Sequence, residues 1–230
     1  VTAVSPSLPD AERQYAHDFA RRLGVTHLEA ATQEMLRPGY RENGTSRCYF
    51  CKAELLDVVG GHLSVLPAGA RVATGTNADD LVAGFRPGIR AAADRGAVTP
   101  LADAGMSKQL IRDTAREWGL AIWDKPQAAC LSSRVAYGIQ ISPQRLARVE
   151  AAELALRRAL ADSGVSSVDV RVRDLGEQAR IEVDAELAGR PGAWQAAAVA
   201  AVAGCGFAEA WIDPQGFRSG SMNEGLLPTT

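Results

Sequence analysis

The chain has 230 residues, of which 47% are hydrophobic and 23% charged, and its formal net charge is −2. This balance is typical of a folded globular protein and excludes a disordered, collagenous or coiled-coil chain. No apolar run approaches the ~18 residues of a membrane span, and the near-neutral charge provides no basic field for nucleic acid. Because the first ten residues also lack the basic-then-apolar order of a secretory signal, we expect a cytoplasmic protein without membrane or nucleic-acid partners.

Strands and helices are predicted to alternate through the first half of the chain. The predicted strands cover residues 1–4, 25–29 and 71–75. The predicted helices cover residues 9–23, 48–59 and 107–118, and a polar loop is expected over 32–46. The last of these helices is expected to begin at a Ser107 cap and to turn four apolar residues inward: Leu110, Ile111, Ala115 and Trp118. Alternation at this spacing favours a parallel α/β sheet.

The pattern of predicted elements changes near residue 142, where Ser142 and Pro143 form a strong helix start. The helix is expected to run to about residue 162, and a second helix is predicted over 193–203. The predicted strands around them cover residues 167–173, 179–184 and 207–213. We therefore predict an α/β domain over residues 1–142 and a small α+β domain over residues 143–230.

The four cysteines indicate a metal, cluster or redox site rather than a disulfide scaffold. Cys48 and Cys51 form a C-x-x-C pair at a predicted helix start, whereas Cys130 and Cys205 stand alone. Two thiolates are half of a metal or cluster site, and Cys130 is the nearest reasonable third ligand, which would leave one coordination position open. The alternatives are a thioredoxin-like dithiol or structural thiols for the pair, and a small buried cysteine for Cys130. Cys205 is expected to be inert packing.

A glycine turn follows the predicted strand over 71–75, in the run Gly75-Thr76-Asn77-Ala78-Asp79-Asp80. Open α/β sheets place ligands at the carboxyl ends of their strands, and Asn and Asp side chains there can bind a ribose, an adenine edge or a metal. The candidate nucleotide-binding residues are Gly75, Thr76, Asn77 and Asp80. The alternative is a plain strand-to-helix turn in which Asn77 or Asp79 caps the helix.

Arginines gather on the predicted strands of the second domain. Alternation over 167–173 is expected to turn three valines to one face: Val168, Val170 and Val172. The opposite, exposed face is expected to carry guanidinium groups, which bind phosphate or carboxylate bidentately. The candidate anion-binding residues are Arg171, Arg173 and Arg180, joined by the Gly/Ser-rich loop 216–221 and its backbone N–H donors. A solvated face paired with Asp169 and Glu182 is the alternative.

Taken together, these motifs resemble a known superfamily, the PP-loop ATP pyrophosphatases. The runs that carry this resemblance are Gly75-Thr76-Asn77-x-Asp79-Asp80, Arg86-Pro87-Gly88, Pro100-Leu101, Lys108 and Ile111-Arg112. Five further runs narrow it: Lys125-Pro126, Cys130-Leu131-Ser132-Ser133-Arg134, Tyr137-Gly138, Gly216-Phe217-Arg218-Ser219-Gly220 and Met222-Asn223. With them the chain is similar, over nearly its whole length, to the LarE family of ATP-dependent sulfur transferases.

The resemblance implies a Rossmann-like PP-loop domain followed by a domain for substrate binding or oligomerisation. It also implies that ATP and Mg²⁺ adenylylate the carboxylate of a pyridinium mononucleotide, which then receives sulfur from a donor. Cys130 is the implied catalytic residue, and Cys48, Cys51 and Cys130 are the implied ligands of a [4Fe-4S] cluster that carries an extra sulfide. In another branch of the family the catalytic cysteine gives up its own sulfur.

Further site residues and partners follow from the same resemblance. The implied substrate-binding residues are Ser133, Arg134, Arg171, Arg173, Arg180, Glu182, Arg218 and Ser219. The implied partners are the small-molecule mononucleotide, a sulfur donor and further copies of the chain in a homo-oligomer.

One motif of the family does not occur in this sequence. The resemblance implies a Ser-Gly-Gly-x-Asp-Ser phosphate loop after the first strand, and no such run is present in the 230 residues. We therefore expect a PP-loop domain that is truncated at its N-terminus and lacks a central strand and the phosphate cradle. Such a chain is expected to bind ATP poorly and to be inactive in ATP-dependent transfer until the upstream segment is restored.

Three other functions fit part of the sequence. A PP-loop tRNA thiolation enzyme also combines ATP with cysteines, but its substrate demands a basic surface, which a net charge of −2 does not favour. A non-catalytic zinc-binding module would use Cys48 and Cys51 structurally, and a truncated remnant would have no activity. Filter binding to tRNA at physiological salt distinguishes the tRNA thiolation enzyme from the proposed transferase, and a colourless protein with stoichiometric zinc would support the zinc-binding module.

Overall fold

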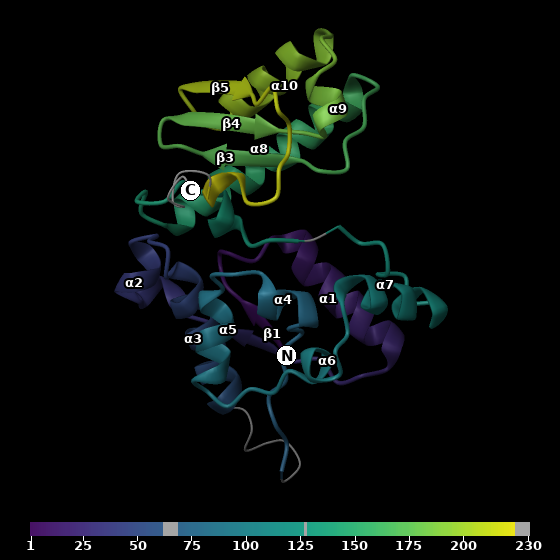
Figure 1. Cartoon of the computed structure of the whole chain (residues 1–230). Coiled ribbons are helices and arrows are strands. Elements are labelled where there is room, and N and C mark those ends of the chain that lie inside the picture. Colours follow the sequence, from purple (N-terminus) through teal and green to yellow (C-terminus); the bar gives the residue numbers. More distant parts are fainter. Residues whose placement is uncertain (62–68, 127, 224–230) are drawn as a thin grey trace. The chain divides into compact units, whose positions relative to one another are not determined.

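The structure, a computed structural model, describes residues 1–61, 69–126 and 128–223. The chain divides into two compact units (Figure 1). Unit 1 consists of Val1–Ser5 and Arg13–Gln127, and unit 2 consists of Pro6–Glu12 and Ala128–Thr230. None of the helices in the described ranges has the length and apolar character needed to cross a membrane.

Unit 1 contains a parallel strand pair, as the α/β prediction requires. Strand β1 (Thr2–Val4) pairs in parallel with β2 (Glu29–Ala31), and helix α1 (Asp10–Leu23) connects them. The remaining helical elements of this unit are η1 (Glu34–Leu36), α2 (Pro38–Arg41), α3 (Arg47–Gly61), α4 (Ala78–Val82), α5 (Pro87–Ala93), α6 (Pro100–Asp103) and α7 (Lys108–Glu117). A parallel pair needs such a crossover connection, so the periodic helix between the two strands gave the correct α/β class.

Three predictions for unit 1 are corrected. The strand predicted over 25–29 is displaced to β2, and the loop predicted over 32–46 contains the short helices η1 and α2. The strand predicted over 71–75 is reduced to a bridge between Ala73 and Val98, held by two backbone hydrogen bonds of 2.9 Å. An apolar run becomes a strand only where a second backbone pairs with it along its length, and the run alone does not supply that partner.

Helix α7 begins as predicted, but its predicted inward face is wrong. The Ser107 hydroxyl oxygen accepts a hydrogen bond from the Leu110 N–H at 3.1 Å, which is the expected cap. Leu110 and Trp118, however, are 49% and 73% exposed. The spacing of apolar residues therefore located the helix correctly without fixing which side of it is covered.

Unit 2 is built from a three-stranded sheet and the helices that pack on it. The sheet has the order β3-β4-β5, with β3 (Arg171–Asp174) antiparallel to β4 (Gln178–Glu182) and β4 parallel to β5 (Glu209–Ile212). The helices are η3 (Leu131–Arg134), α8 (Pro143–Asp162), α9 (Ala185–Ala188), α10 (Ala193–Ala203) and η4 (Ser221–Asn223). The core joins α8 and α10 to the sheet through Leu156, Leu160, Val170, Val172, Ile181, Val183, Trp194, Ala198 and Val202.

The division between the units comes earlier in the chain than the predicted boundary at residue 142. Residues of the intervening segment bond to the sheet of unit 2: Val135 forms a bridge with Asp174, and the Ala136 N–H donates to the Asp174 carbonyl at 2.9 Å. The helix start at Ser142 is confirmed, since its hydroxyl accepts from the Arg145 N–H at 3.2 Å. A helix start is therefore not the point at which the second unit begins.

The predicted exposed arginine face of β3 is wrong. Val170 and Val172 are fully buried, but Val168 is 66% exposed. Arg171 and Arg173 are only 8% and 6% exposed. Both faces of the strand are covered, because the helices pack on one side and η3 lies against the other.

Gly216 lies in a backbone conformation that a side chain cannot enter. Its φ is +67°, and a Cβ there would lie 2.6 Å from the Ala185 Cα and 2.7 Å from the Val183 carbonyl oxygen. Left-handed strain costs about 1–2 kcal/mol and overpacking adds a similar amount, so Gly216→Ala is expected to destabilise unit 2 by about 3 kcal/mol in urea unfolding. Gly138→Ala is the control: its φ is +81° with nothing within 4 Å, so only the strain remains. Equal losses in the two variants would contradict the close approach at Gly216.

Candidate functional site

The cysteines are distributed over both units. Cys48 and Cys51 lie in the first turn and a half of α3 in unit 1, and Cys130 caps η3 in unit 2. All four cysteines are free thiols, with Cys48 exposed and Cys51 and Cys130 partly exposed. Within the described ranges, no group of three His, Cys, Asp or Glu side chains forms a metal site.

The backbone at Cys130 is held by its own loop. Its carbonyl oxygen accepts from the Ser133 N–H at 3.0 Å, from the Ser133 hydroxyl at 2.7 Å and from Arg134 Nη1 at 3.0 Å. Arg134 Nη1 also donates to the Ala129 carbonyl at 2.6 Å. The loop is therefore fixed through its carbonyl groups, and the partly exposed thiol makes no hydrogen bond with the part of the chain that the structure describes.

Arg134 is a structural anchor of this loop. It is 3% exposed, and its Nε donates to Glu153 Oε1 at 2.9 Å. A second nitrogen, Nη2, lies 3.4 Å from Glu153 Oε2. The guanidinium predicted to bind substrate is thus bonded to a carboxylate of α8 and to loop carbonyls. Arg134 therefore holds the backbone of the loop that carries Cys130.

A buried ion-pair network joins the sheet to the Cys130 loop. Arg173 donates to Glu182 Oε2 from Nε at 2.9 Å and from Nη2 at 2.7 Å, and Arg180 Nη2 donates to Glu182 Oε1 at 3.0 Å. Arg173 Nη1 also donates to the Ser133 carbonyl at 3.2 Å. The structure therefore brings the predicted residues Ser133, Arg173, Arg180 and Glu182 together beside the Cys130 loop.

Asp213 links Arg180 of this network to one further arginine, Arg218. Its Oδ2 lies 3.7 Å from Arg180 Nε and 3.5 Å from Arg218 Nη1. Arg180 Nε is buried and has no hydrogen-bond partner among the described residues. A buried N–H without a partner is costly, so this donor suits an anion or other acceptor brought by a ligand.

Arg171 adds positive charge to the same part of unit 2. Burial lowers the pKa of its guanidinium, and the nearby Arg134 and Arg173 lower that pKa further, while Glu153 and Asp169 oppose them. Its Cζ lies 5.3 Å from the centre of the Phe217 ring. Arginines outnumber carboxylates here, with Arg134, Arg171, Arg173, Arg180 and Arg218 against Glu153, Asp169, Glu182 and Asp213. The excess charge favours an anionic ligand.

Several residues of this network were missed in the sequence. Ser221 is 5% exposed, and its hydroxyl donates to Glu182 Oε1 at 2.9 Å, whereas the predicted Ser219 is exposed. Glu153 and Asp213 were also missed. Ser221 could have been found from the sequence, because it is a hydroxyl residue two positions after Ser219 in the same Gly/Ser loop. Nothing in the sequence around Glu153 or Asp213 indicates that these carboxylates pair with distant arginines.

In unit 1 the glycine turn is a helix cap. The Asn77 side chain accepts from the Asp80 N–H at 3.1 Å, and the Asp80 carboxylate accepts from the Asn77 N–H at 3.2 Å. The Thr76 and Thr74 hydroxyls lie 3.0 Å apart, and the Asp79 carboxylate accepts from the Lys108 N–H at 2.7 Å. This geometry confirms the capping interpretation for Asn77, and nucleotide binding by Gly75, Thr76, Asn77 and Asp80 stays a prediction.

The cysteine pair lies at the start of α3 beside a partly buried lysine. Burial lowers the pKa of Lys52, and the adjacent Cys51 opposes that change. Arg47, the other flanking cation, is 5% exposed, and its Nη1 donates to the Asn43 side-chain oxygen. Cys48 is thus exposed and Cys51 partly exposed at the start of α3, while Arg47 is buried in the unit.

Comparison with known proteins finds relatives along almost the whole chain. The chain is 39% identical to the uncharacterized protein slr1717 of Synechocystis over 228 residues. The aligned region covers 98% of this chain and 82% of the relative. It is 29% identical over 231 residues to the pyridinium-3,5-bisthiocarboxylic acid mononucleotide synthase of Lactiplantibacillus plantarum, covering 98% and 79%. It is also 31% identical over 146 residues, 64% of this chain and 54% of the relative, to the uncharacterized protein MJ0830 of Methanocaldococcus jannaschii. No protein-family model matches the chain.

Proposed function

The chain belongs to the family of these relatives, the LarE family, and on this basis we propose that it is an ATP-dependent sulfur transferase of nickel-pincer nucleotide cofactor synthesis. The named relative is a pyridinium-3,5-bisthiocarboxylic acid mononucleotide synthase, so the proposed acceptor is a carboxylate of a pyridinium mononucleotide. The relationship to this synthase supports sulfur transfer as the general activity. Activation of the carboxylate by ATP and the use of an iron–sulfur cluster are our proposal.

The observation that carries the proposal is the arrangement of unit 2. A partly exposed thiol, Cys130, lies on a loop whose Ser133 carbonyl is bonded to Arg173. Arg173 belongs to a network with an excess of arginines, in which the Arg180 Nε–H has no hydrogen-bond partner among the residues that the structure describes. A thiol held beside an anion-binding group is suited to attack an acyl group whose phosphate or second carboxylate is bound by the arginines.

The proposed reaction has two steps. A carboxylate oxygen attacks the α-phosphorus of ATP, supplied with Mg²⁺, and pyrophosphate leaves. A sulfide then attacks the acyl carbon, and AMP leaves with the carboxylate oxygen, which gives the thiocarboxylate directly. If the Cys130 thiol attacks instead, the product is a thioester, and loss of the Cys130 α-proton with cleavage of its Cβ–S bond releases the thiocarboxylate and leaves dehydroalanine. A carboxylate is a poor electrophile, and the AMP leaving group makes the second step feasible. Arg171, Arg173, Arg180 and Arg218 hold the anionic groups of the acceptor, while Arg134 and Glu182 keep the loop and the guanidinium groups in place.

The chemistry of the cysteines fits an iron–sulfur cluster. Cys48 and Cys51 are free thiols three positions apart in α3, and Cys130 is a third free thiol. These three residues would hold a [4Fe-4S] cluster and leave one iron without a protein ligand. When bound, the cluster supplies the sulfur atom for transfer.

The 230 residues contain no Ser-Gly-Gly-x-Asp-Ser phosphate loop. The test therefore measures activation of the carboxylate by ATP and transfer of sulfur to the activated carboxylate in separate assays. The acceptor is supplied as its preformed acyl adenylate, and thiocarboxylate is measured by mass spectrometry after anaerobic reconstitution with iron and sulfide. We expect a brown protein with close to four irons per chain that forms thiocarboxylate, and a loss of iron in Cys48→Ala. A colourless protein with stoichiometric zinc and no product would contradict the proposal. Addition of ATP and free acceptor then tests the first step by pyrophosphate release.

A further inference from the structure

Trp211 lies in the same sheet as the arginine network of unit 2. Strands β3, β4 and β5 run side by side (Figure 1). In their register Arg173 of β3 lies opposite Arg180 of β4, and Arg180 lies opposite Trp211 of β5. Side chains opposite one another in adjacent strands stand on the same face, with Cβ atoms about 5 Å apart. Arg173, Arg180 and Trp211 therefore form one row across the sheet.

This row becomes more exposed from β3 to β5. The Arg173 side chain is 7% exposed and the Arg180 side chain 21%, whereas Trp211 is 37% exposed. Ala210 and Ile212, its neighbours in the strand, pack against the core, so alternation turns the indole to the opposite face. The indole thus borders the open end of the row, beside the Arg180 Nε–H that has no hydrogen-bond partner in the described ranges.

A carboxylate without a cationic partner stands near the indole. Glu209 lies two residues before Trp211 in β5, so its side chain is on the same face of the sheet. Its Oε2 accepts from Gln178 Nε2 at 2.7 Å, and it forms no ion pair with any residue that the structure describes. The neutral amide leaves the negative charge of Glu209 uncompensated, which favours a cation beside the indole.

The indole face is itself suited to a cation. Trp is the aromatic side chain that attracts a cation most strongly, when the cation lies within about 6 Å of the ring centre. Trp211 makes no aromatic or cation–π contact with another residue of the described part of the chain, so its ring is not already stacked. The row therefore has two different ends: the arginines favour an anion, and Trp211 with Glu209 favours a flat cation.

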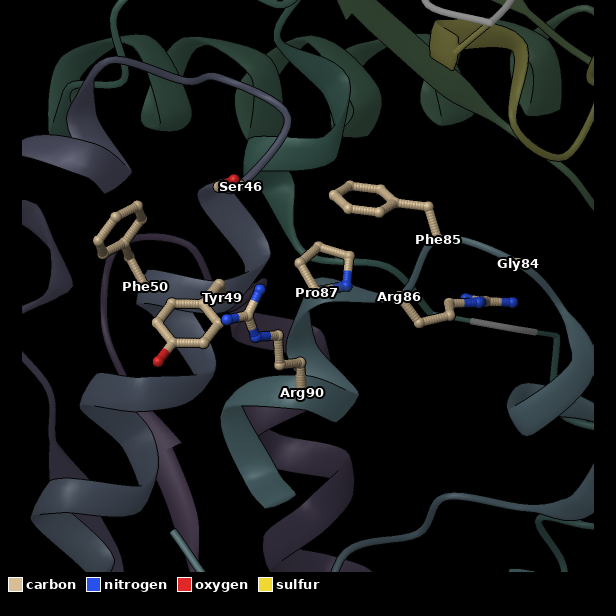
Figure 2. A pocket seen from close by; sticks show the side chains of 8 residues that line it. All are labelled: Ser46, Tyr49, Phe50, Gly84, Phe85, Arg86, Pro87 and Arg90. Atoms are coloured by element: carbon tan, nitrogen blue, oxygen red, sulfur yellow. The ribbon is translucent and has the colours of Figure 1, made fainter. Parts of the chain in front are cut away.

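The aromatic cavity of unit 1 lacks the second of these features. It measures about 510 Å³, and Figure 2 shows the rings of Tyr49, Phe50 and Phe85 around it together with Arg86 and Arg90. None of the described residues that line it carries a carboxylate. A cationic ring there would meet two guanidinium groups and no negative charge, so the cavity provides a comparison site for the test.

We propose that Trp211 and Glu209 select the positively charged ring of the acceptor, which stacks on the indole while Arg173 and Arg180 hold the anionic groups of the same molecule. The inference rests on the proposed function, because the acceptor there is a pyridinium mononucleotide. It adds that the site distinguishes the cationic ring from the same ring without charge. It assigns this discrimination to two residues outside the arginine network.

Calorimetric titration with the oxidised and reduced forms of nicotinamide mononucleotide tests the proposal. The two probes share a ribose phosphate, and only the oxidised ring is cationic. We expect the unaltered chain to bind the oxidised form about tenfold more tightly. Trp211→Leu should remove this preference, and Glu209→Gln should reduce it severalfold. Ribose 5-phosphate, which has no ring, should bind equally to the unaltered chain and to both variants.

Two variants of unit 1 are the controls. Phe85 lines the comparison cavity and is 72% exposed, and Trp118 is a tryptophan that is 73% exposed. Phe85→Leu and Trp118→Leu should leave every affinity unchanged. Trp211→Phe should keep part of the preference for the oxidised ring, because phenylalanine retains a weaker π face. This partial rescue separates stacking on the ring from packing of the strand.

Several results would overturn the assignment. They are failure of the unaltered chain to prefer the oxidised probe, the same preference in Trp211→Leu as in Trp118→Leu, and loss of the preference in Phe85→Leu. Weakening of ribose 5-phosphate by Trp211→Leu to the same degree as the oxidised probe would show a packing role instead.

The transfer assay distinguishes this failure from failure of the proposed function. Thiocarboxylate formation with a KM unaffected by Trp211→Leu contradicts the role of Trp211 alone. Trp211-dependent binding of the oxidised probe by a chain that forms no thiocarboxylate supports that role and contradicts the function.

Discussion

Replacing Cys130 with serine is expected to abolish thiocarboxylate formation, with a loss of at least about a thousandfold, while the acyl adenylate binds as before. The thiol is the sulfur nucleophile or a ligand of its carrier, and a hydroxyl can be neither. The loop is held through the carbonyl of residue 130, Ser133 and Arg134, so serine should preserve its geometry. Product is measured by mass spectrometry from the preformed acyl adenylate, and binding by calorimetry.

Cys205→Ser is the matched control for this prediction. Cys205 follows α10, and its thiol donates to the Ala201 carbonyl at 3.4 Å, so serine keeps the same contact. Its activity should equal that of the unaltered chain. The mass of the protein after turnover then identifies the source of sulfur: loss of the mass of hydrogen sulfide at Cys130 indicates that the residue was consumed, and an unchanged mass indicates a carried sulfide. Full activity of Cys130→Ser would refute the assigned role.

Glu182→Gln is expected to lower the free energy of unfolding of unit 2 by about 4 kcal/mol. Glu182 is fully buried and accepts from Arg173, Arg180 and Ser221. An amide has one acceptor oxygen and turns an N–H toward a guanidinium, so a buried positive charge is left without its counter-ion. Urea unfolding, with hydrogen exchange of the β3–β5 amides to identify the unit, measures the loss.

Glu186→Gln provides the comparison on the same unit. The Glu186 side chain is 88% exposed and lies 3.9 Å from Arg190, so the change should cost less than about 0.5 kcal/mol. The double variant Glu182→Met with Arg173→Met removes both buried charges and should recover part of the stability lost in Glu182→Gln. If Glu182→Gln costs no more than Glu186→Gln, the network does not hold the sheet and its arginines together.

Local signals in the sequence located the helices well. Ser107 and Ser142 were identified as caps from residue type and spacing, and both accept the hydrogen bond that a cap makes. The helix predicted over 193–203 has those bounds. These features depend on contacts between residues a few positions apart, which the sequence lists directly.

The candidate site was only partly predictable. Cys130 and the arginines could be proposed from the sequence, because few other side chains can replace a thiol in sulfur transfer or a guanidinium in anion binding. Their surroundings were not: Arg171 and Arg173 are buried, and Glu153, Asp213 and Ser221 were not recognised as partners. Alternation along a strand separates its two faces, but whether the second face meets water or another segment depends on chain elements far away in the sequence.

The sequence by itself thus determined the longer helices, the α/β class and the residues chemically able to take part in sulfur transfer, because each depends on local spacing or on the chemistry of one side chain. The tertiary structure decided which groups are paired. It reduced the strand over 71–75 to a bridge with Val98, left Trp118 exposed and gave Glu182 its three donors. Pairing and burial are properties of segments brought together by folding, so they cannot be obtained from one segment alone.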